Sequence, residues 1–454
     1  MSQATKLIRG LTLIDAIAIV VGTIIGTGVF LKTATMTQLV GPHWVIVAWI
    51  VGGLLSLTGA LAYAELGSMM PDAGGEYVYL REGYGDLWAF LYGWMRFWIG
   101  SPGSIAAYAV GAMTFMSGVT DLTPFGGQTF CAVMVIILFS TLNCFSVAFG
   151  GRIQALMTAV KMMMLLGIGL GIFFFSRDGS FSHMSAAPAG ESFPFSITAF
   201  GSAVLAALWA YDGWCNLPMV AGEIQNPKRN VPLSLMIGML CILGLYGLVN
   251  LSFFYALPLE EIMSANSSDF PDALPVATKA AMTFLGSSGV TILSAAFVFS
   301  TLGAMNGSIL TSARVPYAMA RDGLFFKKLA DVNEKSHVPV ISIIVQAMVS
   351  IALALSGTFD QLTDYVVFSA WIFYAMVTGV VFKLRKSKPD VPREYKTLGY
   401  PVLPAIFILL GALLLINTVV TSPKSTAIGL TFILLGIPVF SFFKKSVTRA
   451  ERNN

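Results

Sequence analysis

The sequence predicts an all-α integral membrane protein with twelve transmembrane helices. Of its 454 residues, 56% are hydrophobic and 11% are charged, whereas about a quarter of the residues are charged in a typical soluble domain. Apolar runs of about 20 residues, the length that crosses a bilayer, recur along the whole chain. Lysine and arginine gather in alternate loops between these runs, which is the orientation signal of membrane proteins. We therefore expect a lipid bilayer as the surroundings and no nucleic acid as a partner.

The charge pattern orients the predicted spans. In chain order they cover residues 11–37, 44–70, 86–117, 127–147, 152–176, 195–221, 231–256, 286–317, 338–355, 362–383, 400–420 and 425–443. With the N-terminus in the cytoplasm, the outer side receives few of the 27 Lys and Arg residues, namely Lys32, Arg177, Lys279 and Lys424. The positive-inside rule thus places both termini in the cytoplasm.

Two spans carry residues that interrupt a helix near mid-membrane. The first contains Gly22, Gly26 and Gly28, and each glycine weakens a helix by roughly 1 kcal/mol relative to alanine. The sixth contains Asp212 and Gly213. Lipid cannot satisfy unwound backbone, so such a stretch faces a cavity or a ligand. Interrupted spans at matching positions in two halves indicate a transporter site between inverted repeats of five helices.

The free ends of two such broken helices suit a zwitterion. The N–H groups that begin the outer half of span 1, near Gly26–Gly28, form an anion site, which fits an amino acid carboxylate. The carbonyl groups that end the inner half of span 1 and the outer half of span 6 suit an ammonium group. For Gly26 and Gly28 taken alone, simple packing at a helix–helix contact remains the alternative.

The predicted repeats give the domain organisation. We expect a cytoplasmic N-terminus over residues 1–10, a first repeat of spans 1–5 over 11–176, and a second repeat of spans 6–10 over 195–383. Spans 11 and 12 follow over 400–443, and a cytoplasmic tail covers 444–454.

Several motifs resemble the amino acid–polyamine–organocation superfamily, and in particular its L-type amino acid transporter branch. They are Gly22–Gly28, Pro71-Asp-Ala-Gly-Gly-Glu-Tyr-Val-Tyr-Leu80, Trp209–Trp214, Gly222-Glu-Ile-Gln-Asn-Pro-Lys-Arg-Asn-Val-Pro232 and Asn306–Arg314 followed by Ala320-Arg-Asp-Gly323. The chain resembles bacterial alanine-serine-cysteine exchangers. The resemblance implies a LeuT-type fold with a 5+5 inverted repeat, broken helices 1 and 6, and two additional helices, 11 and 12.

The resemblance also implies the residues that bind substrate. Span 1 would hold the carboxylate and the amino group of an amino acid through Thr23, Ile24, Gly26, Thr27 and Gly28. Span 6 would complete the site with Trp209, Ala210 and Asp212, and Trp209 would act as the aromatic gate over the substrate.

Lys161 and Tyr246 match the coupling residues of the family. A lone lysine in mid-span costs about 3 kcal/mol on insertion scales, so Lys161 needs acceptors, and unwound carbonyls of span 1 would supply them. In sodium-coupled relatives a cation lies near that place, and the tethered ammonium of Lys161 would replace it. The alternatives are a snorkelling Lys161 and a Tyr246 that only packs.

Two charged residues within the predicted spans each have two possible roles. Asp212 stands where the animal proteins are expected to have glycine, and it either titrates with transport or caps the inner half of span 6 through backbone N–H groups. Arg96 lies about ten residues into span 3, where it either snorkels or pairs with Glu65.

Partners and cofactors follow from what the motifs lack. The predicted loop over residues 118–126 has no cysteine, so no covalent heavy-chain glycoprotein is expected, and the chain fits a stand-alone protein of the bacterial cytoplasmic membrane. The four cysteines show no CxxC spacing, so neither a metal site nor a disulfide framework is predicted. We expect no cofactor.

The predicted function is a sodium-independent exchanger or facilitator of small neutral L-amino acids, namely alanine, serine, cysteine and threonine. The alternatives are a proton-coupled amino acid importer, a carrier of cationic amino acids or polyamines, and a channel. An intramembrane enzyme is disfavoured, because the predicted spans contain no Ser–His pair and no metal-ligand cluster.

Overall fold

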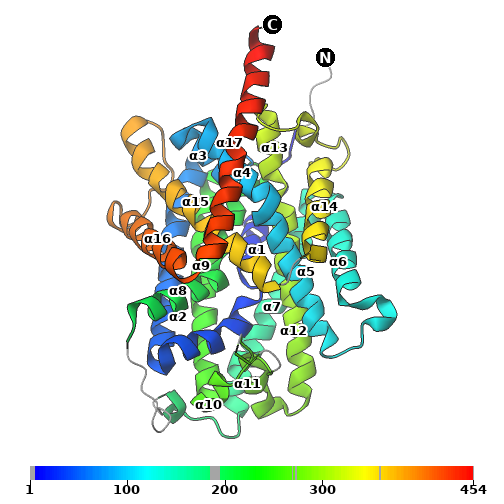
Figure 1. The fold of residues 1–454 in the computed structure, drawn as a ribbon, viewed down its shortest axis with the longest axis vertical. Helices are drawn as coiled ribbons and strands as arrows, with labels where there is room; N and C mark the ends of the chain where they lie inside the picture. The colour runs from blue at the N-terminus through cyan, green and yellow to red at the C-terminus, as the bar shows by residue number, and fades with distance from the viewer. Residues whose placement is uncertain (1–5, 185–194, 268, 271–272, 357–358, 453–454) are drawn as a thin grey trace.

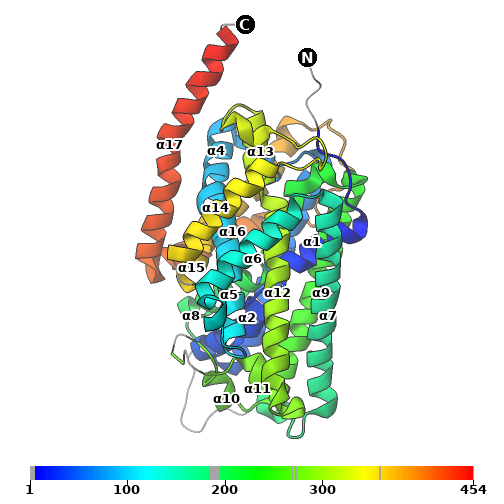
Figure 2. The ribbon, with the colours of Figure 1, turned by 90° about the vertical axis from the view of Figure 1, so that its right-hand side faces the viewer.

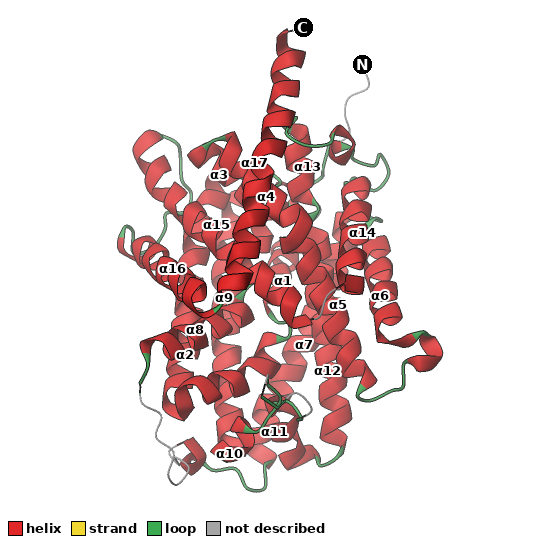
Figure 3. Ribbon diagram, viewed as in Figure 1, coloured by secondary structure: helices red, strands yellow, loops and turns green. Residues whose placement is uncertain are grey.

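The computed structural model describes residues 6–184, 195–267, 269–270, 273–356 and 359–452. Within these ranges the chain consists of helices and loops, and its one extended pairing is an isolated bridge between Leu11 and Ile224 (Figure 3). The prediction of an all-α protein is confirmed.

Six helical stretches of the described chain are long and apolar enough to cross a membrane. They are Leu13–Met69, Val147–Phe175, Pro227–Ala256, Ser288–Arg321, Val402–Thr421 and Thr426–Lys445. Shorter apolar helices cover Gly127–Asn143, Val276–Leu285 and Val340–Ser356. The protein is thus a multi-pass membrane protein, whereas the count of twelve spans stays a prediction.

The first half of the described chain contains seven α-helices, one π-helix and one 3₁₀ helix (Figure 1). In order they are α1 (Leu13–Ile24), α2 (Gly28–Met69), α3 (Glu76–Tyr84), α4 (Asp86–Met95), the π-helix η1 (Arg96–Gly100), α5 (Ser101–Ser117), the 3₁₀ helix η2 (Thr123–Phe125), α6 (Gly127–Asn143) and α7 (Val147–Phe175).

The second half also combines long α-helices with short helical segments. It contains the 3₁₀ helix η3 (Phe181–Met184), α8 (Ile197–Tyr211), the 3₁₀ helix η4 (Trp214–Glu223), α9 (Pro227–Ala256), α10 (Leu259–Met263), α11 (Val276–Leu285), α12 (Ser288–Ser312), α13 (Arg314–Arg321), the 3₁₀ helix η5 (Lys327–Ala330), α14 (Val340–Ser356), α15 (Phe359–Ser387), α16 (Val402–Thr421) and α17 (Pro423–Arg452).

The connection between the first two predicted spans differs from the expected loop over residues 38–43. Inside α2 only Gly41 leaves the helical region, with φ 72° and ψ 175°. Glycine adopts a positive φ at little cost because it has no Cβ. Pro42 then restarts the helix, as proline commonly does at a first helical position. The two spans therefore meet in a sharp turn at one residue.

The broken first span lies inside the bundle. α1 packs between α7, α9 and α12, and α8 packs along α2. α17 packs against α4, α15 and α16 at the edge of the molecule, and its C-terminal end extends beyond the other helices (Figure 2). Both ends of the described chain lie at the same end of the bundle (Figure 1), which we call the terminal face.

Candidate functional site

The first predicted span is interrupted where its glycines lie. α1 ends at Ile24, residues 25–27 are not helical, and α2 begins at Gly28. Ile25 turns the chain with φ −71° and ψ 92°. The last carbonyl groups of α1 and the first N–H groups of α2 therefore lack partners within their own helices.

The sixth predicted span is interrupted at the matching place. α8 ends at Tyr211, Asp212 and Gly213 form a turn, and η4 begins at Trp214. Gly213 has a φ of 125°, a conformation that favours glycine. Both interruptions thus fall within the segments that the sequence indicated.

The two interruptions are in contact with each other. A Cβ atom on Gly28 would lie 2.5 Å from the Cα atom of Ala210, and one on Gly213 would lie 2.8 Å from the carbonyl oxygen of Thr23. The Thr23 hydroxyl donates a hydrogen bond of 3.0 Å to the carbonyl oxygen of Gly213. Glycine is needed at both positions because backbone meets backbone there.

Tyr246 of α9 joins the two broken spans through one hydroxyl group. It donates to the carbonyl oxygen of Ile24 at 3.2 Å and to that of Ala210 at 3.0 Å. The side chain is 1% exposed. These carbonyls end the helices α1 and α8, so Tyr246 satisfies orphan acceptors of both breaks at once.

Lys161 of α7 lies behind the first break. Its ammonium group donates to the carbonyl oxygens of Gly22 and Ile25, both at 2.7 Å, and to that of Ser300 at 2.9 Å. The side chain is 1% exposed, so it does not snorkel. The acceptors from span 1 are those that the sequence predicted. Ser300 of α12 is an addition, and its hydroxyl also donates to the Ile25 carbonyl at 3.1 Å.

Other predicted substrate residues surround these breaks. Ile24 and Thr27 are buried, with exposed fractions of 3% and 2%. Trp209 and Asp212 keep part of their surface accessible although they lie deep in the bundle. Tyr108 of α5 is also partly accessible, and its Cε1 atom would lie 3.1 Å from a Cβ atom on Gly26. The sequence contained no signal for Tyr108.

Asp212 does not take the cap position of the inner half of span 6, which was one of the two roles that the sequence left open. Gly213 takes the cap position of η4, with no side-chain hydrogen bond to the helix. The Asp212 carboxylate instead accepts a bond of 2.9 Å from the hydroxyl of Tyr374 in α15. The same hydroxyl lies 3.0 Å from the Cys215 sulfur. Tyr374 is a residue that sequence reasoning missed, because nothing in its spacing distinguished it from a packing tyrosine.

Arg96 neither snorkels nor pairs with Glu65. It is 5% exposed, and its Nη2 atom donates to the Asn216 side-chain oxygen in η4 at 2.9 Å. Glu65 is bound to Arg385, with 2.7 Å between Nη2 and Oε2. Arg96 therefore ties span 3 to the inner half of span 6, a role that the position of Arg96 alone did not reveal.

A buried ion pair fixes the end of span 6 that lies at the terminal face. Arg314 of α13 holds Glu223 with two bonds, 2.7 Å from Nε to Oε1 and 3.0 Å from Nη2 to Oε2, and both side chains are 0% exposed. The backbone N–H of Leu11 donates to the Glu223 carbonyl at 3.0 Å, and the N–H of Gln225 donates to the Leu11 carbonyl at 2.8 Å. The start of α1, the end of η4 and α13 are thereby joined.

A second ion pair joins α3 to the turn after α13 at the same face. Arg81 of α3 binds Asp322, which also accepts a bond of 2.8 Å from the Tyr77 hydroxyl. Desolvation lowers the pKa of Arg81, but the charge and hydrogen bond of Asp322 outweigh it, so that the pKa lies above its ordinary value. Arg81 therefore keeps its positive charge over the physiological range.

Two broken spans that meet inside a helical membrane bundle, with a buried lysine behind them, define a secondary transporter of the broken-helix kind. Comparison with known proteins agrees. Residues 11–443 match the family model described as amino acid permease. The chain belongs to the amino acid permease family.

Curated relatives cover nearly the whole chain. The chain is 33% identical over 439 residues to the serine/threonine exchanger SteT of Bacillus subtilis, covering 95% of this chain and 96% of the relative. It is 30% identical over 448 residues to the human b(0,+)-type amino acid transporter 1, covering 97% and 89%. It is 31% identical over 438 residues to the mouse large neutral amino acids transporter small subunit 2, covering 94% and 80%. The resemblance is thus confirmed: the protein is an amino acid transporter of the antiporter class, and not an enzyme.

Proposed function

We propose that the protein exchanges small neutral L-amino acids, such as alanine, serine, cysteine and threonine, by alternating access and without sodium. The observation that carries this proposal is the contact between the two breaks, where Tyr246 bonds to the ends of both α1 and α8. A ligand bound between these helix ends would contact both broken spans, so its binding could change the position of both.

Polarity of the helix ends supports a zwitterionic substrate. The N-terminus of α2, near Gly28, has free N–H groups and the positive end of a helix dipole, which attract a carboxylate. The ends of α1 and α8 present carbonyl groups to an ammonium group. Thr23, Ile24, Gly26 and Thr27 would line the carboxylate side, and Trp209, Ala210 and Asp212 the opposite side, with Trp209 closing over the substrate.

Sodium independence is supported by Lys161. Its ammonium group takes two carbonyls of span 1 and one of span 8, the kind of oxygen ligands that a bound cation would use. A second monovalent cation within this small group of acceptors would meet the repulsion of a fixed positive charge.

We also infer the finer architecture. The two breaks lie five spans apart, which supports a LeuT-type core of two inverted repeats over residues 11–176 and 195–383, with two more spans over 400–443. Both ends of the described chain lie at the terminal face, which requires an even number of crossings and fits twelve. The lysine and arginine pattern supports both termini in the cytoplasm of a bacterium. The loop over 118–126 lacks cysteine, so we propose transport without a covalent heavy-chain partner.

One observation favours a second substrate class. Asp212 lies in the break of span 6 with part of its surface accessible, and among the described residues its carboxylate has no ion-pair partner. Such a carboxylate would attract the side-chain cation of a basic amino acid. Cationic amino acids are therefore the second candidate.

Uptake by purified protein in liposomes tests both candidates. Internal unlabelled serine or alanine should accelerate uptake of labelled serine, and replacing sodium by potassium should leave the rate unchanged. A requirement for sodium, or uptake that needs a pH gradient and no internal amino acid, would overturn the proposal. If arginine is exchanged as well, Asp212→Asn should lower its exchange far more than that of serine.

A further inference from the structure

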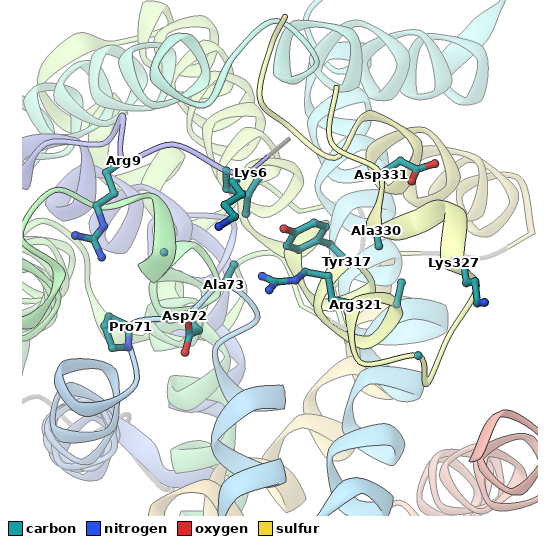
Figure 4. Close-up of a pocket in the computed structure, with 14 residues that line it drawn as sticks. Lys6, Arg9, Pro71, Asp72, Ala73, Tyr317, Arg321, Lys327, Ala330 and Asp331 are labelled. Atoms are coloured by element: carbon teal, nitrogen blue, oxygen red, sulfur yellow. The ribbon is translucent and has the colours of Figure 1, made fainter. Parts of the chain in front are cut away.

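A hollow opens at the terminal face, away from the two breaks. Its volume is about 810 Å³, and its walls come from three segments of the chain: the residues before α1, the loop between α2 and α3, and the stretch from α13 to η5 (Figure 4). Gly222, which precedes the buried Glu223 of the ion pair with Arg314, also lines it. The hollow therefore lies over this end of span 6.

The walls of the hollow carry more positive than negative groups. The charged residues that line it are Lys6, Arg9, Arg321, Lys327, Asp72 and Asp331. Among the residues that the structure describes, none of these six side chains has an ion-pair partner within 4.0 Å. Lys6 and Arg321 lie on facing walls, and Tyr317 lies beside Arg321 (Figure 4), with 5.8 Å between its ring centroid and the Arg321 guanidinium carbon.

We propose that this hollow binds an anion that carries a phosphate group and at least two negative charges. Concave walls with one dominant sign of charge raise the local concentration of the opposite ion. The planar guanidinium of Arg321 matches phosphate oxygens in pairs, and Lys6 supplies a point charge from the other wall. A phosphate between them would also relieve the repulsion between unpaired cations. A soluble phosphate compound and the headgroup of a phospholipid with two phosphate groups share this chemistry.

Binding at this place restrains the inner end of the transport path. Lys6 and Arg9 precede α1, whereas Arg321 ends α13 and Lys327 begins η5. The Arg81–Asp322 pair holds this segment, from the end of α13 to η5, to α3. An anion bridging the walls would fasten α1 to that segment. This consequence rests on the proposed function, in which α1 moves for the path to open toward the terminal face; the site itself does not.

Direct binding tests the site without any transport. The full-length protein in detergent is titrated with sodium pyrophosphate, and its thermal unfolding midpoint is followed, with sodium sulfate at equal ionic strength as the reference salt. We expect a saturable rise of the midpoint with pyrophosphate beyond that with sulfate. In the double variant Lys6→Gln/Arg321→Gln, the apparent affinity should fall by about tenfold or more, because hydrogen bonds between charged groups are lost.

A matched double variant controls for charge. Lys386 and Lys396 are exposed and lie outside the hollow, so Lys386→Gln/Lys396→Gln removes the same charge and should bind pyrophosphate like the native protein. If Lys6→Gln/Arg321→Gln is not monodisperse, Arg9→Gln/Lys327→Gln replaces it with the same expectation. An equal effect of sulfate, no saturable shift in the native protein, or equal weakening in the control variant would each overturn the site.

Exchange in liposomes then tests the consequence and identifies the source of the phosphate. Pyrophosphate present on both sides of phosphatidylcholine vesicles should lower serine exchange by the native protein and not by Lys6→Gln/Arg321→Gln. Replacing part of the lipid by cardiolipin, whose headgroup carries two phosphate groups, is then compared without pyrophosphate. If cardiolipin lowers serine exchange by the native protein and not by Lys6→Gln/Arg321→Gln, the ligand is a lipid headgroup; otherwise it is soluble. Bound pyrophosphate with unchanged exchange would overturn the restraint. A protein that binds pyrophosphate but exchanges no amino acid in any vesicle would instead overturn the proposed function.

Discussion

Adding one methyl group at Gly28 should separate the two broken spans. A Cβ there would stand 2.5 Å from the Cα and Cβ atoms of Ala210, whereas ordinary van der Waals contact begins at 3.4 Å. The spans must therefore part by about 1 Å, and overpacking of this kind costs about 1–3 kcal/mol. The higher helix propensity of alanine offsets at most about 1 kcal/mol of this destabilisation. The same movement would lengthen the bond of 3.0 Å from Tyr246 to the Ala210 carbonyl beyond hydrogen-bond range.

Serine exchange in liposomes and thermal stability in detergent measure this effect for Gly28→Ala. We expect the protein to remain folded and its exchange rate to fall by roughly tenfold or more, since about 1.4 kcal/mol of strain in the state that joins the breaks changes its population tenfold. Gly244→Ala in α9 is the control, because a Cβ there would meet nothing within 4 Å. Native exchange by Gly28→Ala, or an equal loss in Gly244→Ala, would refute the reasoning.

Three further substitutions, and one control at an exposed ion pair, address the groups around the breaks and the end of span 6. Lys161→Ala removes the donor of three buried carbonyls and should lower exchange more than about tenfold; native rates would show that the ammonium is dispensable. Tyr246→Phe keeps the ring and loses both bonds to the breaks, so exchange should slow while the purified protein stays monodisperse, and an unchanged rate would exclude the hydroxyl from coupling. Arg314→Ala leaves Glu223 buried without its partner, which costs about 3–5 kcal/mol and should lower the unfolding midpoint by several degrees. Lys388→Ala, at an ion pair whose lysine is 46% exposed, should cost less than about 1 kcal/mol, and equal midpoint shifts for these two variants would contradict the importance of burial.

Sequence reasoning placed the breaks because their cause is local. Glycines at positions 22, 26 and 28 and the Asp212–Gly213 pair weaken helices wherever they stand, and the structure interrupts the chain at 25–27 and 212–213. The same reasoning predicted carbonyl acceptors of span 1 for Lys161, since a buried ammonium must find oxygen atoms. The sharp turn at Gly41 was missed, because the sequence gives the length of an apolar run more clearly than the geometry of its end.

Hydrogen-bond partners that lie far apart in the chain could not be predicted from the sequence. Tyr374 reaches Asp212 across 162 positions, and Arg96 reaches Asn216 across 120. No periodicity connects such pairs, so the alternatives that the sequence offered for Asp212 and Arg96 did not include Tyr374 or Asn216 as partners. Asp212 and Arg96 each have a polar partner, as burial favours, but the identity of that partner depends on how the helices pack.

The most direct measurement concerns the two charged ends of the substrate. Labelled serine, its methyl ester and its N-acetyl derivative are compared for uptake into liposomes loaded with unlabelled serine, because the ester removes the carboxylate charge and acetylation removes the ammonium charge. If the free ends of α1, α2 and α8 hold a zwitterion, serine is exchanged and both derivatives are not. Exchange of either derivative at the rate of serine would contradict the claim that the broken helices bind the substrate through its two opposite charges.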